Sequence, residues 1–198
     1  MSLQVPGMHL VGFTTRCGKY PSFDTLGYNA GTMQIRLLTS FDAAAFHSLR
    51  LEGLRESPSA FTASFDEESV TPLSEIARRL APGSGRIYFG VFDGDELIAI
   101  ARVDRDVSPK QSHRAHIRGV YVSSAHRGKG AARKLMEYAL DIAASLKGVT
   151  HVSLAVTAGN ERAQKLYESF GFVAWGCEPA ALIVDGVAYD EIPMTKVL

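Results

Sequence analysis

The feature that most constrains the fold is a β-branched run that leads through a glycine-spaced basic loop into a long amphipathic helix. The run ends at residues 120–122, the loop glycines are Gly128 and Gly130, and the helix begins near Ala131. Residues 151–157 then alternate apolar and polar side chains, which predicts a strand. A strand, a crossover helix and a second strand in one sheet form a right-handed parallel unit, so an α/β fold is expected.

The loop between this strand and helix has the properties of a phosphate-binding site. The first turn of a helix carries unpaired N–H groups and a partial positive charge. Gly128 and Gly130 lack a Cβ, so a diphosphate can approach the backbone closely, and Arg127 and Lys129 add mobile positive charge beside it. The sequence therefore predicts a diphosphate at the start of this helix.

Two other phosphate loops do not fit these residues. If Lys129 were the lysine of a mononucleotide P-loop, a glycine would stand at position 123 and a serine or threonine at position 130, where the chain has Ser123 and Gly130. A dinucleotide fingerprint that starts at Gly128 needs a glycine or alanine at position 133, which is Arg133. A nucleotide-binding module is therefore the disfavoured alternative.

The composition argues against several broad classes of protein. Lysine plus arginine and aspartate plus glutamate both number 21, and this balance argues against broad binding to nucleic acid. The chain has no run of about 18 apolar residues, so no membrane span is expected. Cys17 and Cys177 lack the spacing of a disulfide framework or a zinc site, so a reducing, cytoplasmic location is expected. No metal site is predicted, because His113 and His116, three apart on a strand, would point to opposite faces.

The chain is expected to divide near Met33. Residues 1–32 carry three charged side chains and no sustained hydrophobic period, so they are expected to form a poorly structured N-terminal extension, and residues 33–198 the folded domain. Helix caps are expected at Ser40 or Asp42 for a first helix and at Thr71 for a second. The expected strands cover residues 34–38, 86–92, 97–104, 116–122, 151–157, 172–174 and 189–197. The expected helices run from the two caps to about residues 55 and 80, from 131 to 146 and from 160 to 170.

Two motifs carry a resemblance to a known family. The loop matches R-x-x-G-x-G/A at Arg127, Gly130 and Ala132. About 30 residues later, the pattern N-x-x-A-x-x-x-Y followed by G-F is matched by Asn160, Ala163, Tyr167, Gly171 and Phe172. Together the motifs resemble the cofactor-binding segments of the GNAT superfamily of acetyl-CoA-dependent N-acetyltransferases. The resemblance in element order covers residues 34–198.

The resemblance implies a central mixed, mostly antiparallel sheet of six to seven strands with about four flanking helices, in which the parallel central strands splay apart. It implies acetyl-CoA as co-substrate, with the diphosphate at the loop and the pantetheine along the strand that ends at Val122, where it would pair as an added strand. Tyr167 is then the candidate general acid for the departing thiolate, and an N–H near Val122 the candidate oxyanion donor. The cofactor-binding residues indicated by the resemblance and the loop chemistry are Val120, Tyr121, Val122, Arg127, Gly128, Lys129, Gly130, Ala131, Ala132, Asn160, Ala163 and Tyr167.

The expected acceptor is a primary amine of a small molecule or protein that attacks acetyl-CoA directly in a ternary complex. The amine must be neutral to attack, but no single base stands out. His116, Glu52 and Asp104 are candidates, and deprotonation through water is equally compatible. A catalytically inactive acyl-CoA-binding sensor of the same fold is the alternative function. Many relatives are dimers, so a homodimer is compatible with the sequence, although no stretch specifies an interface.

Overall fold

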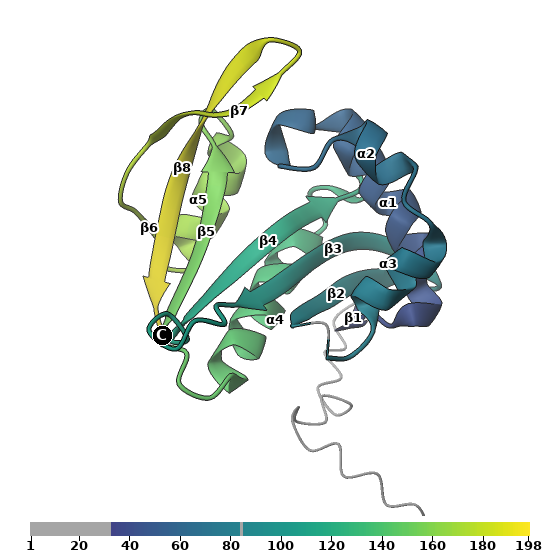
Figure 1. Ribbon diagram of the computed structural model, residues 1–198, viewed down its shortest axis with the longest axis horizontal. Coiled ribbons are helices and arrows are strands. Elements are labelled where there is room, and N and C mark those ends of the chain that lie inside the picture. The colour runs from purple at the N-terminus through teal and green to yellow at the C-terminus, as the bar shows by residue number, and fades with distance from the viewer. Residues whose placement is uncertain (1–32, 84) are drawn as a thin grey trace, which may run out of the picture.

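A computed structural model describes residues 33–83 and 85–198 of the chain, and the expected extension at residues 1–32 lies outside them. The described residues form one sheet of eight strands with helices on both faces (Figure 1). The strands are β1 (Met33–Leu37), β2 (Arg86–Asp93), β3 (Glu96–Arg105), β4 (Arg114–Val122), β5 (His151–Thr157), β6 (Val173–Ala174), β7 (Glu178–Val184) and β8 (Val187–Val197). The helices are α1 (Ala43–Glu56), α2 (Phe65–Ser69), α3 (Leu73–Leu80), α4 (Ala131–Ser145) and α5 (Glu161–Ser169), with 3-10 turns η1 (Ser40–Asp42), η2 (Pro58–Ala60) and η3 (Ser124–His126).

The sheet has the order β1–β2–β3–β4–β5–β8–β6, and β7 pairs with β8 off this path. Every pair is antiparallel except β4 and β5, which are parallel and are connected through α4. The predicted fold class is therefore confirmed. Across the described residues the structure has eight strands and five α-helices, where the resemblance implied six to seven strands and about four helices.

The additional helix, α2, has a start signal that the sequence analysis missed. The Ser64 hydroxyl accepts a hydrogen bond from the Glu67 N–H, and the Glu67 carboxylate accepts one from the Ser64 N–H, both at 3.2 Å. This reciprocal capping box corresponds to the pattern S-x-x-E, which is readable in the sequence. Thus α2 was predictable.

The two expected helix caps differ in outcome: Asp42 occupies the N-cap position of α1 without a side-chain capping bond, whereas Thr71 does not occupy that of α3. Asp42 precedes α1, but its carboxylate turns back to accept the Thr39 N–H at 2.8 Å and to pair with Arg36 at 2.7 Å, so it closes the 3-10 turn η1 rather than capping α1. Helix α3 begins at Leu73, one residue later than predicted, and the cap position is occupied by Pro72 rather than by Thr71. Both errors concern one turn of chain, where a polar side chain has several backbone groups within reach.

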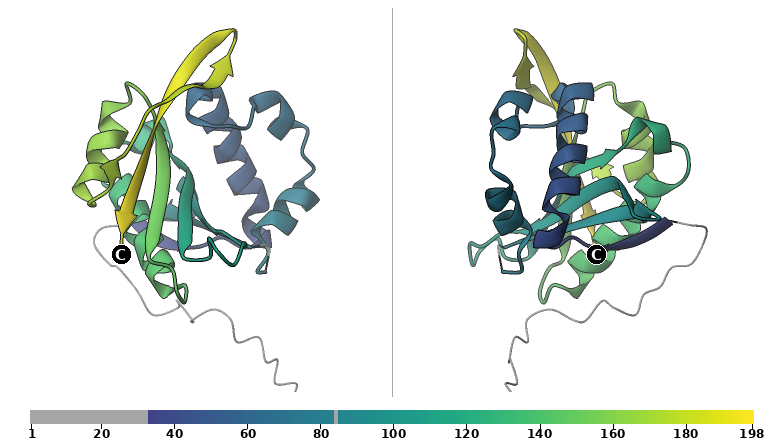
Figure 2. Two further views of the ribbon diagram at one scale, coloured as in Figure 1. Left: turned by 60° about the vertical axis from the view of Figure 1, so that its left-hand side comes forward. Right: turned by 90° about the vertical axis from the view of Figure 1, so that its right-hand side faces the viewer.

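Hydrophobic cores lie on both faces of the sheet. Figure 2 shows α1, α2 and α3 on one side of the sheet and α5 on the other, with α4 also on the side of α5. Helix α4 buries Leu135, Met136 and Ile142 completely against this second face, as its apolar stripe predicts. Each such side chain contributes roughly 1.5–3 kcal/mol through the apolar surface it removes from water. None of the helices in the described part of the chain is long and apolar enough to cross a membrane.

Candidate functional site

Strands β4 and β5 are joined only at their beginnings. Their parallel register covers residues 114–116 of β4 and 151–153 of β5, after which β4 follows β3 and β5 follows β8. Just beyond this point Gly119 and Val120 together oppose Ala101 of β3 in a β-bulge, and Gly119 has φ +62°, which side chains rarely tolerate. The two strands diverge (Figure 1), and residues of both line a groove of about 1320 Å³. The expected splay is confirmed.

The glycine loop borders this groove on the α4 side of the sheet. Gly128 and Gly130 have φ of +80° and +91°, and Gly130 is the N-cap of α4. The first backbone bond of the helix runs from the Lys134 N–H to the Gly130 carbonyl at 3.1 Å, so the N–H groups of Ala131 and Ala132 precede the intrahelical ladder. A Cβ added at either glycine would meet no atom within 4 Å, which leaves the backbone open to an anion.

The two basic residues of the loop differ from their prediction as mobile charges beside a diphosphate. The Arg127 guanidinium pairs with the Glu56 carboxylate at the end of α1, at 2.7 Å and 2.9 Å, and its Nε donates to the Val122 carbonyl at 3.2 Å. Arg127 borders the groove but is held on its α1 side. Lys129 is exposed and is not among the described residues that line the groove. Loop spacing predicted the position of Arg127 but not its partner in α1, and binding of a diphosphate by Arg127 and Lys129 stays a prediction.

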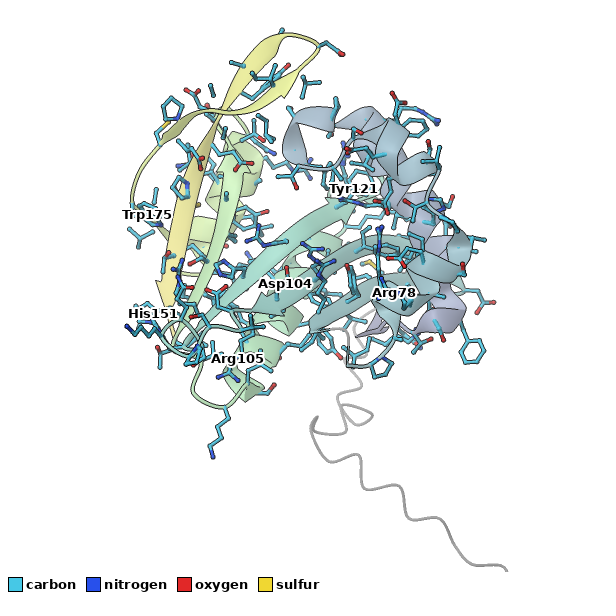
Figure 3. All side chains as sticks on the ribbon, viewed as in Figure 1. Arg78, Asp104, Arg105, Tyr121, His151 and Trp175 are labelled. Carbon is cyan, nitrogen blue, oxygen red and sulfur yellow. The ribbon has the colours of Figure 1, made fainter. Side chains whose placement is uncertain are left out.

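The end of β4 presents its side chains to both faces of the sheet. Val120 and Val122 are half-buried against the core under α4, whereas Tyr121 is buried beneath α1, at the upper end of β4 in Figure 3. The Tyr121 hydroxyl donates to Glu56 at 2.5 Å and to Glu52 at 3.0 Å. Burial, and then these two carboxylates, raises the pKa of Tyr121. The Tyr121 side chain therefore fastens α1 to β4.

Helix α5 also borders the groove, on the same side of the sheet as the glycine loop and α4. The Asn160 side chain accepts the Ala163 N–H at 3.2 Å, so the predicted cap is confirmed. Tyr167 is buried, borders the groove and packs edge-on against Phe172, with ring centroids 6.3 Å apart. Its hydroxyl has no side-chain hydrogen bond to any of the residues that the structure describes. Burial raises the pKa of Tyr167 to about 12, so the phenol keeps its proton at neutral pH.

The three candidate bases have different surroundings. His116 borders the groove, and its Nε2 lies 3.1 Å from an oxygen of Asp106. Asp104, labelled in Figure 3, pairs with arginines of β3 and β4 at 3.2 Å and 3.5 Å. Glu52 is engaged by the buried tyrosine of β4. Of the three, His116 alone lines the groove in the described part of the chain.

Two carboxylates that the sequence analysis missed also border the groove. Glu178 of β7 and Glu191 of β8 are directly opposite one another in the antiparallel pair. Burial, and then the charge of Glu178, raises the pKa of Glu191, while Arg118 of β4 lowers it. No local pattern marks these residues, because only the fold of the last hairpin brings them beside β4.

The two histidines considered for a metal have separate environments. His113 precedes β4 and packs edge-on against His151, with ring centroids 5.4 Å apart, whereas His116 contacts Asp106. Within residues 33–83 and 85–198, no three or more histidine, cysteine, aspartate or glutamate side chains are grouped to hold a metal ion.

Comparison with known proteins gives consistent relatives. Over 132 residues the chain is 30% identical to a spermidine N(1)-acetyltransferase of Vibrio cholerae, covering 66% of this chain and 74% of that one. Over 71 residues it is 37% identical to the Bacillus subtilis protein YwnH, whose name provisionally assigns it as a phosphinothricin acetyltransferase. That match covers 36% of this chain and only 43% of the Bacillus protein.

The fold also has solved counterparts. The structure of YncA from Salmonella typhimurium, provisionally described as an acetyltransferase and solved with its cofactor acetyl-CoA, superimposes with a TM-score of 0.70. The superposition covers 85% of this chain and 95% of that one at 21% sequence identity, so it supports the fold. Residues 51–172, more than half of the chain, match the acetyltransferase (GNAT) family. The chain belongs to the GNAT family of acetyltransferases.

Proposed function

We propose that this protein transfers the acetyl group of acetyl-CoA to a primary amine, by direct attack in a ternary complex. One observation carries the proposal: a groove leads from an open glycine loop at the start of α4, between splayed parallel strands, to the buried Tyr167. Family membership supports acetyl-CoA as the co-substrate. The groove passes between the two faces of the sheet, which leaves one face for the cofactor and the other for the acceptor.

In the proposed complex the diphosphate lies against Gly128, Gly130 and the first N–H groups of α4. The pantetheine lies along the part of β4 that has left β5, where a ligand amide would pair as an added strand. An N–H near Val122 would then face the thioester oxygen as negative charge develops on it. Asn160 and Ala163 would close the groove from the α5 side.

Tyr167 is proposed to donate its hydroxyl proton toward the coenzyme A sulfur as the carbon–sulfur bond breaks. Full transfer from a phenol of pKa about 12 to a thiolate whose conjugate acid has a pKa near 8.5 is uphill by about 5 kcal/mol. The main contribution of Tyr167 is therefore a hydrogen bond to the developing thiolate, and the proton that finally appears on sulfur derives from the attacking amine or solvent. Among the residues that line the groove, His116 and Glu191 are candidates to receive the amine proton.

Thermal unfolding with ligands and release of free thiol test the proposal together. Acetyl-CoA at millimolar concentration is expected to raise the melting temperature, whereas ATP and NAD are not. Thiol release with an amine panel then separates an acetyltransferase from an inactive acyl-CoA sensor of the same fold. Because relatives are named for phosphinothricin and spermidine, the panel includes both an amino-acid-like acceptor and a polyamine. If acetyl-CoA does not raise the melting temperature, its assignment as co-substrate is overturned. If it raises the melting temperature but no thiol is released, the inactive sensor is favoured.

The role of Tyr167 has its own variant and control. Tyr167→Phe is expected to lower kcat by about 10²-fold or more while the affinity for acetyl-CoA changes little, because loss of one hydrogen-bond donor to a developing negative charge typically costs this much. Tyr189→Phe removes a tyrosine hydroxyl from β8 that does not line the groove and is expected to be silent. Equal kcat in Tyr167→Phe and the unmodified protein would remove Tyr167 from the chemistry.

A cytoplasmic location, a homodimer and a domain boundary at residue 33 belong to the same proposal.

A further inference from the structure

Arg50 of α1 projects into the groove from the side opposite the glycine loop. A Cβ added at Gly119, the bulge glycine of β4, would lie 3.7 Å from Nη1 of Arg50. The guanidinium therefore lies over the point at which β4 leaves β5. It packs on the Phe61 ring at 4.5 Å from the ring centroid, which fixes its orientation.

Arg50 forms no hydrogen bond or ion pair with any residue in the described ranges 33–83 and 85–198, yet it is largely removed from water. Burial lowers the pKa of Arg50, but a guanidinium stays charged in proteins. A partly buried cation without a counterion is costly, since burial is compensated only by paired charges and hydrogen bonds. Arg50 lines the groove, and its N–H donors have no hydrogen-bond acceptor among the described residues, which leaves capacity for an anion.

The neighbouring carboxylates are already engaged by other arginines. Glu68, whose charge acts on Arg50, pairs with Arg79 at 3.1 Å, and Arg79 also pairs with Glu75 at 3.2 Å. Asp104 is shared by Arg102 and Arg118. Each of these neighbouring arginines thus has a carboxylate partner, which Arg50 lacks among the described residues.

The opposite wall of the acceptor side carries the reverse charge. Glu178 and Glu191 lie opposite one another in the β7–β8 hairpin, and burial and then the charge of Glu178 raise the pKa of Glu191, while Arg118 lowers it. An ammonium group placed between the two carboxylates would relieve their repulsion. One wall of this part of the groove thus favours an anion and the other favours a cation.

We propose that the acceptor is a primary amine that also carries a carboxylate, of the free amino acid class, with its carboxylate bound by Arg50 and its amine directed toward Glu178 and Glu191. A guanidinium binds a carboxylate through two parallel N–H···O bonds, which also fixes the orientation of the amine relative to β4. A polyamine lacks the carboxylate that would pair with Arg50, so it is expected to be the poorer acceptor. This inference rests on the acetyltransferase function proposed above.

The test compares each free amino acid with its own amide, and both with spermidine, in the thiol-release assay with the full chain. The best amino acid is expected to exceed its amide in kcat/KM by about 10- to 100-fold, the usual effect of charge-assisted hydrogen bonds. Arg50→Gln is expected to abolish this preference, mainly through KM, while Arg50→Lys retains part of it. Arg78→Gln is the matched control, because Arg78 lies on α3, pairs with Glu75 and does not line the groove (Figure 3).

The outcomes separate this inference from the function on which it rests. Turnover of amides or spermidine as fast as of any amino acid, or an amino-acid preference that survives Arg50→Gln, would overturn the acceptor class while leaving the acetyltransferase intact. Stabilisation by acetyl-CoA without turnover of any amine would overturn the function alone. In that case the acceptor class is tested by the melting temperature in saturating coenzyme A. The inference requires that an amino acid raises the melting temperature more than its amide does, and that Arg50→Gln removes this difference.

Discussion

Gly53 allows α1 to approach β4 closely, and replacing it gives a direct measure of that packing. A Cβ at this position would lie 3.0 Å from both Cγ and Cδ2 of Tyr121. Gly53 is inside α1, where alanine is normally preferred by about 1 kcal/mol. Helix propensity and core packing therefore oppose one another, and the structure indicates which effect is larger.

Packing is expected to dominate because the Tyr121 ring cannot retreat. It is buried, its hydroxyl is bonded to Glu52 and Glu56, and the Phe61 ring lies against it at a centroid distance of 6.3 Å. Overpacking of this kind costs typically 1–3 kcal/mol. After the propensity gain of about 1 kcal/mol, Gly53→Ala should destabilise the protein by up to about 2 kcal/mol, which corresponds to a fall in melting temperature of up to roughly 8 °C for a domain of this size.

Chemical and thermal denaturation of Gly53→Ala measure this value, and a second background tests its cause. In Tyr121→Ala, the ring is absent, so adding Gly53→Ala should be neutral or stabilising, and the double-mutant cycle should give a coupling of about 1–3 kcal/mol. If Gly53→Ala by itself stabilises the protein, the Tyr121 ring accommodates the added Cβ without cost, and the packing argument is wrong. Equal destabilisation in both backgrounds would assign the effect to something other than Tyr121.

Three further outcomes are expected. Gly130→Ala should lower stability by about 1–2 kcal/mol because φ is +91°, and should weaken acetyl-CoA binding in calorimetry. Glu56→Gln releases Arg127 and should tighten acetyl-CoA binding. Tyr121 first, and then Arg127, lower the pKa of Glu56, so the contribution of Glu56 to stability is present above its unfolded pKa and is lost as pH falls through its folded pKa. The variant should therefore show a shallower loss of stability in acid titrations. Asn160→Ala should lower the free energy of unfolding by about 1 kcal/mol through loss of the α5 cap, whereas Asn160→Ser should keep most of the cap's contribution; urea denaturation measures both.

The elements that sequence reasoning predicted well are those specified by neighbouring residues. The glycine loop, the apolar stripe of α4 and the cap at Asn160 each depend on residues within a few positions of one another. The parallel β4–β5 unit follows from their order along the chain. The missed helix α2 belongs to the same class, since Ser64 and Glu67 form a readable capping pattern.

The side of the groove that is proposed to bind the acceptor could not be predicted in this way. Arg50 comes from α1, Glu178 and Glu191 from the last hairpin, and each is an ordinary polar residue within its own element. Their significance arises from which partners they have or lack after folding. The same limit explains Arg127, whose position the motif predicts but whose ion pair with Glu56 comes from a helix far earlier in the chain.

The two halves of the groove depend on one irregularity in β4. The bulge at Gly119 shifts the register against β3 next to the point where the β5 ladder ends, which opens the cofactor side. On the other side of the sheet, the Arg50 guanidinium lies close to the same residue, since a Cβ at Gly119 would be 3.7 Å from Nη1 of Arg50. A residue other than glycine at this position would have to adopt a left-handed backbone. Gly119 therefore lies between the open end of the β4–β5 ladder and the proposed acceptor contact at Arg50, although it contributes no functional group of its own.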